Sequence, residues 1–333
     1  MLVAAIAARA GVTKAKFGFQ KDTVLTSTRG MGAMVPAPTG IPVLNARQAT
    51  QSSVALGGTT LAGTAIEGTA NQTPAGLHPP GPLPIGTKLP TPVNADKLEF
   101  YLQGYPQDKI QYLVNGFRFG FPLGFKGERT GQNCKNSKSA MLHPDIVSQK
   151  LQKEIAAGRI AGPFDSKPFQ NIHLSPLGLV PKKNGDFRLI HNLSFSENQG
   201  VSSINEGIPR EMAQVKYAGV DDAVRCLKSL GTGAYMVKVD ILQAFRQLPV
   251  APRDYPLLGF TWGGKFYYDK CLVMGASSSC KSFEALSTAL EWIMLNKLAV
   301  PCCVHCLDDF WTAHTSKKNV SDCCLSFWLC VRS

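Results

Sequence analysis

The sequence Val304-His305-Cys306-Leu307-Asp308-Asp309-Phe310-Trp311 (VHCLDDFW) places two adjacent aspartates inside an apolar run. The residues on either side predict two short strands, and the aspartates predict the tight turn between them. Two unit charges about 4 Å apart repel by roughly 4 kcal/mol at an effective dielectric of about 20. The pair is therefore either a solvated turn whose repulsion is screened, or a site that binds a positive charge.

The elements around this hairpin follow from hydrophobic periodicity and turn residues. A second hairpin is predicted around Lys182–Asp186, because Asn-Gly stands there between two apolar runs. Helices are predicted over 143–158, 221–231 and 277–298, and further strands over 234–242 and 264–273. This order indicates an α+β fold, in which an antiparallel sheet carries helices on one face.

Asp240 stands near the end of the strand predicted over 234–242. If that strand lies beside the 304–311 hairpin, Asp240, Asp308 and Asp309 converge at one edge of the sheet. Carboxylates are the ligands that Mg²⁺ prefers, and two such ions can stabilise both the attacking and the leaving oxygen of a phosphoryl transfer. The alternative is a solvated turn and a strand-end cap, and the spacing alone leaves both readings open.

The charge balance favours an anionic partner. The chain has 333 residues and a net charge of +12, which is typical of nucleic-acid-binding proteins although weak evidence alone. Residues 1–92 are rich in Gly, Ala, Thr and Pro and hold only two aromatic residues, so we expect a disordered arm. No run of 18 apolar residues occurs, so no membrane span is expected.

Four motifs follow one another along the second half of the chain. They are 175–194 (SPLGLVPKKNGDFRLIHNLS), 239–245 (VDILQAF), 272–283 (LVMGASSSCKSF) and 304–310 (VHCLDDF). With the preceding segments 92–121 and 151–164, they resemble retrotransposon reverse transcriptases of the DIRS-like, tyrosine-recombinase group. The resemblance covers roughly residues 92–313 and implies the fingers and palm of a right-hand polymerase. It also implies an RNA-directed DNA polymerase that uses two Mg²⁺ ions, or Mn²⁺ in their place.

The resemblance also implies roles for the acidic motifs. Asp240 and Asp308 would be the metal ligands shared by both ions, and the backbone carbonyl of Ile241 would be a further ligand. Asp309 would be the lesser member of the catalytic set. It would adjust the local charge more than bridge the two metal ions. For Asp309 the alternative is a solvated acid in a turn.

The nucleotide-binding residues are likewise implied by the resemblance. Phe245 would lie under the sugar of the incoming nucleotide and block a 2′-hydroxyl, while its alternative role is that of a core residue. Lys183 and Arg188 would hold the triphosphate, Arg188 through its bidentate guanidinium. Lys182 could substitute for Lys183, and the alternative for both lysines is a solvated turn.

The motif at 272–283 would support the nascent base pair. Gly275 would allow close backbone approach, and Ser279 would cap the helix that follows. Family members often carry Gln at the position of Met274 and Pro at that of Cys280. These departures put a side-chain hydrogen bond to the nucleotide in doubt.

The ten cysteines are scattered and no secretory signal precedes them, so reduced thiols inside the cell, in the cytoplasm or nucleus, are expected. A zinc site at Cys302, Cys303, His305 and Cys306 is a rival reading. Strand alternation would place these side chains on two faces, which is against it. The cysteines are more simply explained as small core residues.

The chain is therefore predicted to have four parts: a disordered arm (1–92), a helical and aromatic segment (93–170), fingers and palm (171–313), and an aberrant or truncated tail (314–333). Nothing in the tail resembles a primer grip or thumb. We expect binding of metal, dNTPs and an RNA or DNA template-primer, with impaired synthesis. The alternative function is an inactive retroelement remnant that only binds nucleic acid. The sequence does not predict the oligomeric state.

Overall fold

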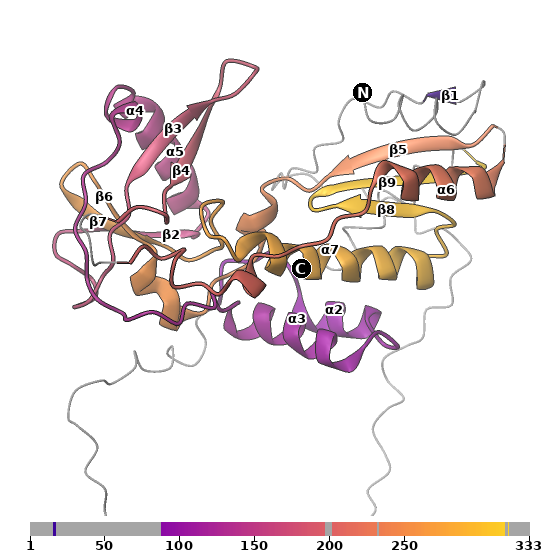
Figure 1. The fold of residues 1–333 in the computed structure, drawn as a ribbon, viewed down its shortest axis with the longest axis horizontal. Coiled ribbons are helices and arrows are strands. Elements are labelled where there is room, and N and C mark those ends of the chain that lie inside the picture. The colour runs from indigo at the N-terminus through magenta and orange to yellow at the C-terminus, as the bar shows by residue number, and fades with distance from the viewer. Residues whose placement is uncertain (1–15, 18–87, 197–201, 232, 317–318, 320–333) are drawn as a thin grey trace, which may run out of the picture. The chain divides into compact units, whose positions relative to one another are not determined.

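The computed structural model describes residues 16–17, 88–196, 202–231, 233–316 and 319 (Figure 1). These residues form a mixed fold of helices and mainly antiparallel sheets, in line with the α+β prediction. Among the described helices, none combines the length and the apolar character needed to cross a bilayer.

The main sheet contains the predicted acidic motifs. Its strand order is β1-β5-β9-β8, with β5 at Tyr235–Asp240, β9 at Asp309–His314 and β8 at Cys303–Cys306. The pairs β5–β9 and β8–β9 are antiparallel. The strands predicted over 234–242 and around the 304–311 turn are therefore confirmed, and they are neighbours in one sheet.

Helices cover both faces of this sheet, so the prediction of helices on one face is wrong. The long helix α7 (Ser279–Asn296) packs against the face formed by Val239, Cys303 and Phe310. The helix α6 (Val220–Leu230) packs against the opposite face, which includes Met236 and Trp311. The reason is that the strands carry apolar side chains on both faces of the sheet, so each face needs a covering layer.

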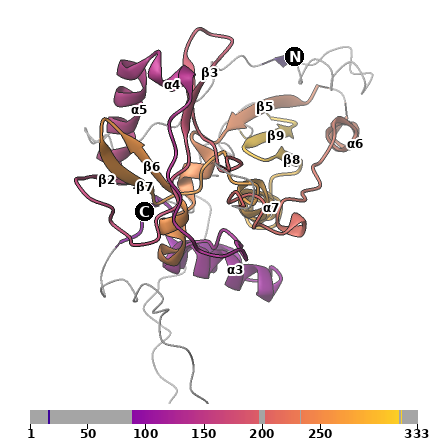
Figure 2. The same cartoon turned by 60° about the vertical axis from the view of Figure 1, so that its left-hand side comes forward.

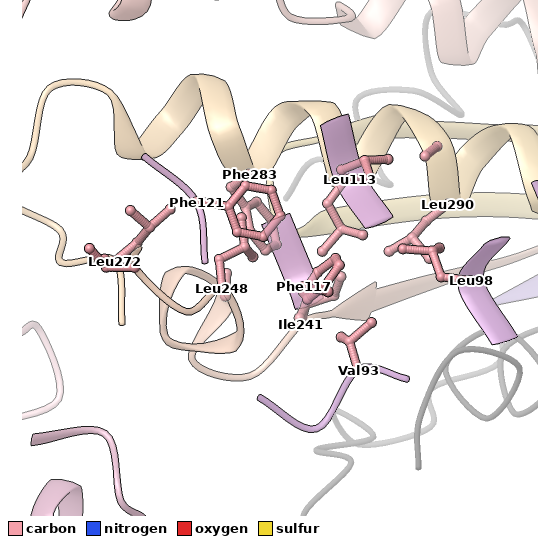
Figure 3. Packing of buried hydrophobic residues seen from close by; sticks show 14 of the residues in the cluster. Val93, Leu98, Leu113, Phe117, Phe121, Ile241, Leu248, Leu272, Phe283 and Leu290 are labelled. Carbon is pink, nitrogen blue, oxygen red and sulfur yellow. The ribbon is translucent and has the colours of Figure 1, made fainter. Parts of the chain in front are cut away.

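Two further helices complete the layer below α7. They are α2 (Ala95–Tyr101), which begins at the N-cap Asn94, and α3 (Gln107–Phe119). Leu113 and Phe117 of α3 belong to the same buried cluster as Phe283 and Leu290 of α7 (Figure 3). Burying such side chains stabilises the fold by roughly 1.5–3 kcal/mol each.

Two smaller sheets lie elsewhere in the described residues (Figure 2). The three-stranded sheet has the order β2-β7-β6, from β2 (Ile160–Phe164), β7 (Lys265–Asp269) and β6 (Gly259–Trp262). The hairpin β3–β4 joins Leu177–Pro181 to Phe187–His191, as the Asn-Gly signal predicts. The remaining elements are α4 (Lys138–Met141), α5 (Pro144–Ala156), η1 (Arg210–Met212), η2 (Ala244–Gln247) and η3 (Pro252–Leu257).

Most of the arm predicted over residues 1–92 lies outside the described residues, and the part that is described makes a few contacts. The strand β1 (Lys16–Phe17) pairs in parallel with the start of β5. Leu89 is buried, and the Thr91 hydroxyl donates to the Gln247 carbonyl at 2.7 Å. Ordered packing thus begins before residue 93. Most of the predicted tail at 314–333 is likewise outside the described residues.

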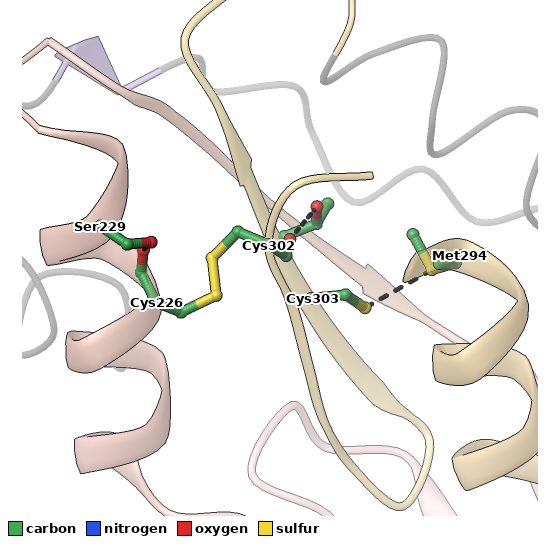
Figure 4. The surroundings of a disulfide bond; sticks show 6 residues. Cys226, Ser229, Met294, Cys302 and Cys303 are labelled. Atoms are coloured by element: carbon green, nitrogen blue, oxygen red, sulfur yellow. Dashed lines mark hydrogen bonds between the residues drawn. A yellow bond between two sulfur atoms is a disulfide. The ribbon is translucent and has the colours of Figure 1, made fainter. Parts of the chain in front are cut away.

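Cys226 of α6 and Cys302, just before β8, form a disulfide (Figure 4). The expectation of reduced thiols is therefore wrong for this pair. The physical reason is that α6 lies on the sheet face to which Cys302 points, which brings two residues 76 positions apart into contact. Cys303 is buried in the core, as expected, and its thiol lies 3.5 Å from the Met294 sulfur, whereas Cys306 is exposed.

Candidate active site

The register of the main sheet brings the three predicted aspartates together. Asp240, the last residue of β5, lies directly opposite Asp309, the first residue of β9. The backbone N–H of Ile241 donates to the carbonyl of Asp308 at 3.0 Å. The end of β5 is thereby fastened to the β8–β9 turn, and the convergence inferred from the sequence is present in the structure.

The β8–β9 turn is as tight as an antiparallel hairpin permits. Cys306 pairs with Asp309, so only Leu307 and Asp308 form the loop. Leu307 has a φ of 52°, a left-handed conformation that is uncommon for a bulky residue. Such conformations persist where the surroundings hold them, and here the strands and the Ile241–Asp308 hydrogen bond fix the turn.

The three carboxylates lie close enough together to repel one another. Burial, together with the Asp309 and Asp308 carboxylates, raises the pKa of Asp240 to about 6. Burial and Asp309 also raise the pKa of Asp308, against the opposing effects of nearby Lys238 and Arg188. The cluster therefore has more negative charge than its surroundings neutralise, which is the condition under which a cation is bound.

Lys238 also belongs to this cluster, although no sequence motif singles it out. Its Nζ lies 2.7 Å from Oδ1 of Asp309. Lys238 and Asp240 are two positions apart on β5, so they project from the same face of the sheet. The predicted strand and the two-residue spacing were the signal that could have revealed Lys238.

The predicted triphosphate-binding residues lie on the β3–β4 hairpin. Arg188 on β4 is near enough to the turn to lower the pKa of Asp308. Lys182 is engaged elsewhere, because its Nζ lies 3.0 Å from a carboxylate oxygen of Asp186, which Lys150 also contacts. Lys183 is exposed in the loop of the hairpin. Of the three, Arg188 is the one that the structure brings to the aspartates.

Phe245 is half-buried in η2, immediately beyond Asp240. Its ring packs edge-on against Phe283 at 5.6 Å between centroids, so it is part of the core while one side stays accessible. Both readings of Phe245 are compatible with this position. The neighbouring Arg246 is half-buried and pairs with Asp269 at 2.7 Å and with Glu154 at 2.9 Å.

The backbone at Gly275 packs closely against the backbone at His191. A Cβ at Gly275 would lie 1.9 Å from the carbonyl oxygen of His191, so a side chain is excluded there. The predicted helix cap at Ser279 is wrong, because Ser278 occupies the N-cap position and has no side-chain capping bond. Ser279 is fully buried, and its hydroxyl donates to the Val273 carbonyl at 2.7 Å. The Ser279 side chain is thus directed into the core.

His305 supports the hairpin from the opposite face. Its Nε2 lies 3.2 Å from Glu284, and its Nδ1 contacts Glu291, both on α7. Burial alone would lower the pKa of His305, but hydrogen bonds to the two carboxylates outweigh it and raise the pKa to about 9. A protonated imidazole therefore ties β8 to α7 three residues before Asp308.

The carboxylates of Asp240 and Asp308 suit a divalent cation that takes its other ligands from water or from a bound substrate. Within the described residues, no group of three His, Cys, Asp or Glu side chains is arranged to hold a metal ion. Mg²⁺ seldom needs such a cage, because it usually takes one or two carboxylates together with waters and substrate phosphates. Asp240 and Asp308, with their raised pKa values, match that requirement.

Comparisons with known proteins give similarities to foamy virus proteins. No protein-family model matches the chain. Over 146 residues it is 30% identical to the Pro-Pol polyprotein of simian foamy virus type 1, covering 44% of this chain and 11% of that protein. The chain thus spans about a tenth of that curated relative.

Two solved structures of foamy virus proteins also align with the chain. The crystal structure of a prototype foamy virus protease-reverse transcriptase CSH mutant aligns with a TM-score of 0.47 at 20% identity, over 71% of this chain and 31% of that chain. A foamy viral protease-reverse transcriptase dRH in complex with double-stranded DNA aligns with a TM-score of 0.46 at 15% identity, over 77% and 44%.

Proposed function

We propose that the chain is a fragment of an RNA-directed DNA polymerase from a DIRS-like retroelement, acting in the cytoplasm or nucleus. It would transfer nucleotides from dNTPs to the 3′-hydroxyl of a primer on an RNA or DNA template. The observation that carries the proposal is the β5–β9 register, which sets Asp240 opposite Asp309 and beside Asp308. The order of the four motifs and the similarity to a Pro-Pol polyprotein support it.

Asp240 and Asp308 would hold Mg²⁺, with the carbonyl of Ile241 as a further ligand. The bound ions would stabilise negative charge on the oxygens of the transferred phosphoryl group. The protein's own contribution is position. The sheet register and the Ile241–Asp308 hydrogen bond hold the carboxylates on rigid backbone, which limits the reorganisation needed when substrate binds.

The nucleotide would lie between the main sheet and the β3–β4 hairpin residues. Arg188, with its fork of donors, is suited to the triphosphate, and Lys183 would add a point charge. Phe245 would form the floor under the sugar, where its ring leaves no room for a 2′-hydroxyl. The packing of Phe245 on Phe283 would keep that floor rigid.

Primer extension on an RNA template with Mg²⁺ tests the proposal. We expect Asp240→Asn and Asp308→Asn to reduce extension at least about a hundredfold, as loss of a metal ligand should. Asp145→Asn, an exposed change on α5, is the matched control and should leave extension unchanged. Phe245→Val should let ribonucleotides compete with deoxynucleotides. Extension that survives Asp240→Asn would refute the proposed site.

A nucleic-acid-binding remnant is the second candidate, favoured by the net charge of +12. It predicts template-primer binding that falls steeply with salt, because phosphate contacts release counterions. It also predicts that no extension is seen with Mg²⁺ or Mn²⁺. Binding of the same strength in the wild type and in Asp240→Asn, without synthesis by either, would favour this candidate.

A further inference from the structure

Lys238 is a fixed positive charge inside the cluster of acidic residues. Strand alternation puts Lys238 and Asp240 on one face of β5, and the register puts Asp309 on the same face of β9. Lys238 sits one diagonal step from Asp309, a separation that a long side chain spans easily. The ammonium nitrogen is 2.7 Å from Oδ1 of Asp309, which is the distance of a charge-assisted hydrogen bond.

The pairing gives Asp309 a cationic partner at ion-pair distance, which distinguishes it from the other two aspartates. Asp309 is already satisfied by an ammonium donor, whereas no described basic side chain forms an ion pair with Asp240 or Asp308. When all four side chains are ionised, their net charge is −2, which a single divalent cation neutralises. Without Lys238 the same face would present three free carboxylates, a donor set that holds a cation tightly without any phosphate.

We propose that Lys238 is a built-in counter-ion that holds Asp309 out of the divalent-cation site and leaves Asp240 and Asp308 as its side-chain ligands. This inference rests on the proposed function, because it specifies how that site selects its ligands. Its consequence is that the free cation binds weakly and gains affinity when substrate phosphates complete the coordination. Lys238 is thus a positioning residue that acts through Asp309.

Binding of Mn²⁺ to the full chain, followed by the electron paramagnetic resonance signal of the free ion, tests the inference without requiring catalysis. Lys238→Met removes the charge at similar length and should raise Mn²⁺ affinity about tenfold, since Asp309 becomes a third ligand. Lys238→Arg keeps the charge and should restore the wild-type affinity. Lys138→Met, an exposed change on α4 with the same loss of charge, should change affinity less than about twofold.

The double variant Lys238→Met/Asp309→Asn separates the inference from simple charge removal. If Lys238 acts through Asp309, the tenfold gain disappears in the Asp309→Asn background. An equal gain in both backgrounds, or no gain from Lys238→Met alone, would overturn the inference. Circular dichroism on each variant checks that the fold is retained.

The proposed function fails in a different way. Asp240→Asn and Asp308→Asn should each weaken Mn²⁺ binding at least tenfold. If neither does so, the cation does not bind at this site, and the proposed function falls together with the inference. If both do so while Lys238→Met has no effect, only the inference is wrong.

Discussion

Replacing His305 by glutamine tests whether the charged cluster of His305, Glu284 and Glu291 beside the β8–β9 hairpin stabilises the fold. The imidazole is 7% exposed and lies between two carboxylates of α7, from Glu284 and Glu291. Its ring also stacks on Phe310, two residues beyond the aspartate turn. Glutamine can keep one hydrogen bond but has no charge, so two partly buried carboxylates would lose their counter-ion.

The magnitude follows from the raised pKa. His305 titrates at about 9 in the folded chain and at 6.5 as an unperturbed group, and each pH unit of difference is worth about 1.4 kcal/mol. The protonated pair therefore contributes about 3 kcal/mol. Because the folded pKa lies above the unfolded one, this contribution is complete below pH 6.5. It declines as the pH rises and is lost once the pH passes about 9.

Urea denaturation of the wild type and of His305→Gln between pH 5 and 10 measures this effect. We expect the variant to be about 3 kcal/mol less stable at pH 6 and the gap to narrow steadily between pH 6.5 and 9. His143→Gln, an exposed change, is the control and should show no such gap. A gap that stays constant from pH 5 to 10 would refute the assignment of a charged imidazole, since a purely steric role does not titrate.

Three further changes have defined outcomes. Gly275→Ala should destabilise the chain by about 3 kcal/mol or more in urea denaturation, because its Cβ would overlap the His191 carbonyl oxygen. Asp240→Asn should raise the melting temperature at pH 7 but hardly at pH 4, since Asp240 has a raised pKa and is already largely protonated there. Reduction of the Cys226–Cys302 disulfide should cost about 2–4 kcal/mol, because it closes a long loop of the unfolded chain.

Each of these changes has its own check. Gly219→Ala is the control for Gly275, because Gly219 has an ordinary φ and the nearest atom to a new Cβ is 3.8 Å away. For Asp240, equal stabilisation at pH 4 and pH 7 would rule out relief of charge repulsion. For the disulfide, a Cys226→Ser variant should lose the sensitivity to reductant, and a reductant effect that persists in it must come from another bond.

Local patterns predicted most of the secondary structure. The β3–β4 hairpin follows from Asn184-Gly185 between apolar runs, and α7 follows from its periodic apolar face. The adjacency of Asp240 to Asp308 and Asp309 required the family resemblance as well, because spacing alone does not order strands in a sheet. Ser279 was misassigned because a serine near a helix start can cap or can bond backwards to a carbonyl, and only packing decides.

Side-chain partners that are distant in sequence could not be predicted. The pairing of His305 with Glu291 depends on how α7 lies on the sheet. The disulfide depends in the same way on the position of α6. Such contacts leave no periodic trace in the sequence, because the two partners stand on separate elements whose packing sets the contact. Lys238 differs, because its partner is fixed by strand register and by the two-residue period of the strand.

A network of largely buried charges next to Phe245 connects the candidate site to residues well before its motifs. Arg246 pairs with Glu154 of α5 and with Asp269 of β7, and Glu154 also pairs with Arg159. Breaking a buried pair typically costs 3–5 kcal/mol, because the remaining charge is left without a partner. The position of the Phe245 ring therefore depends on the segment predicted to precede the polymerase as much as on the motif that contains it. The carboxylates of Glu154 on α5 and Asp269 on β7 thus hold Arg246, the residue next to Phe245, in place.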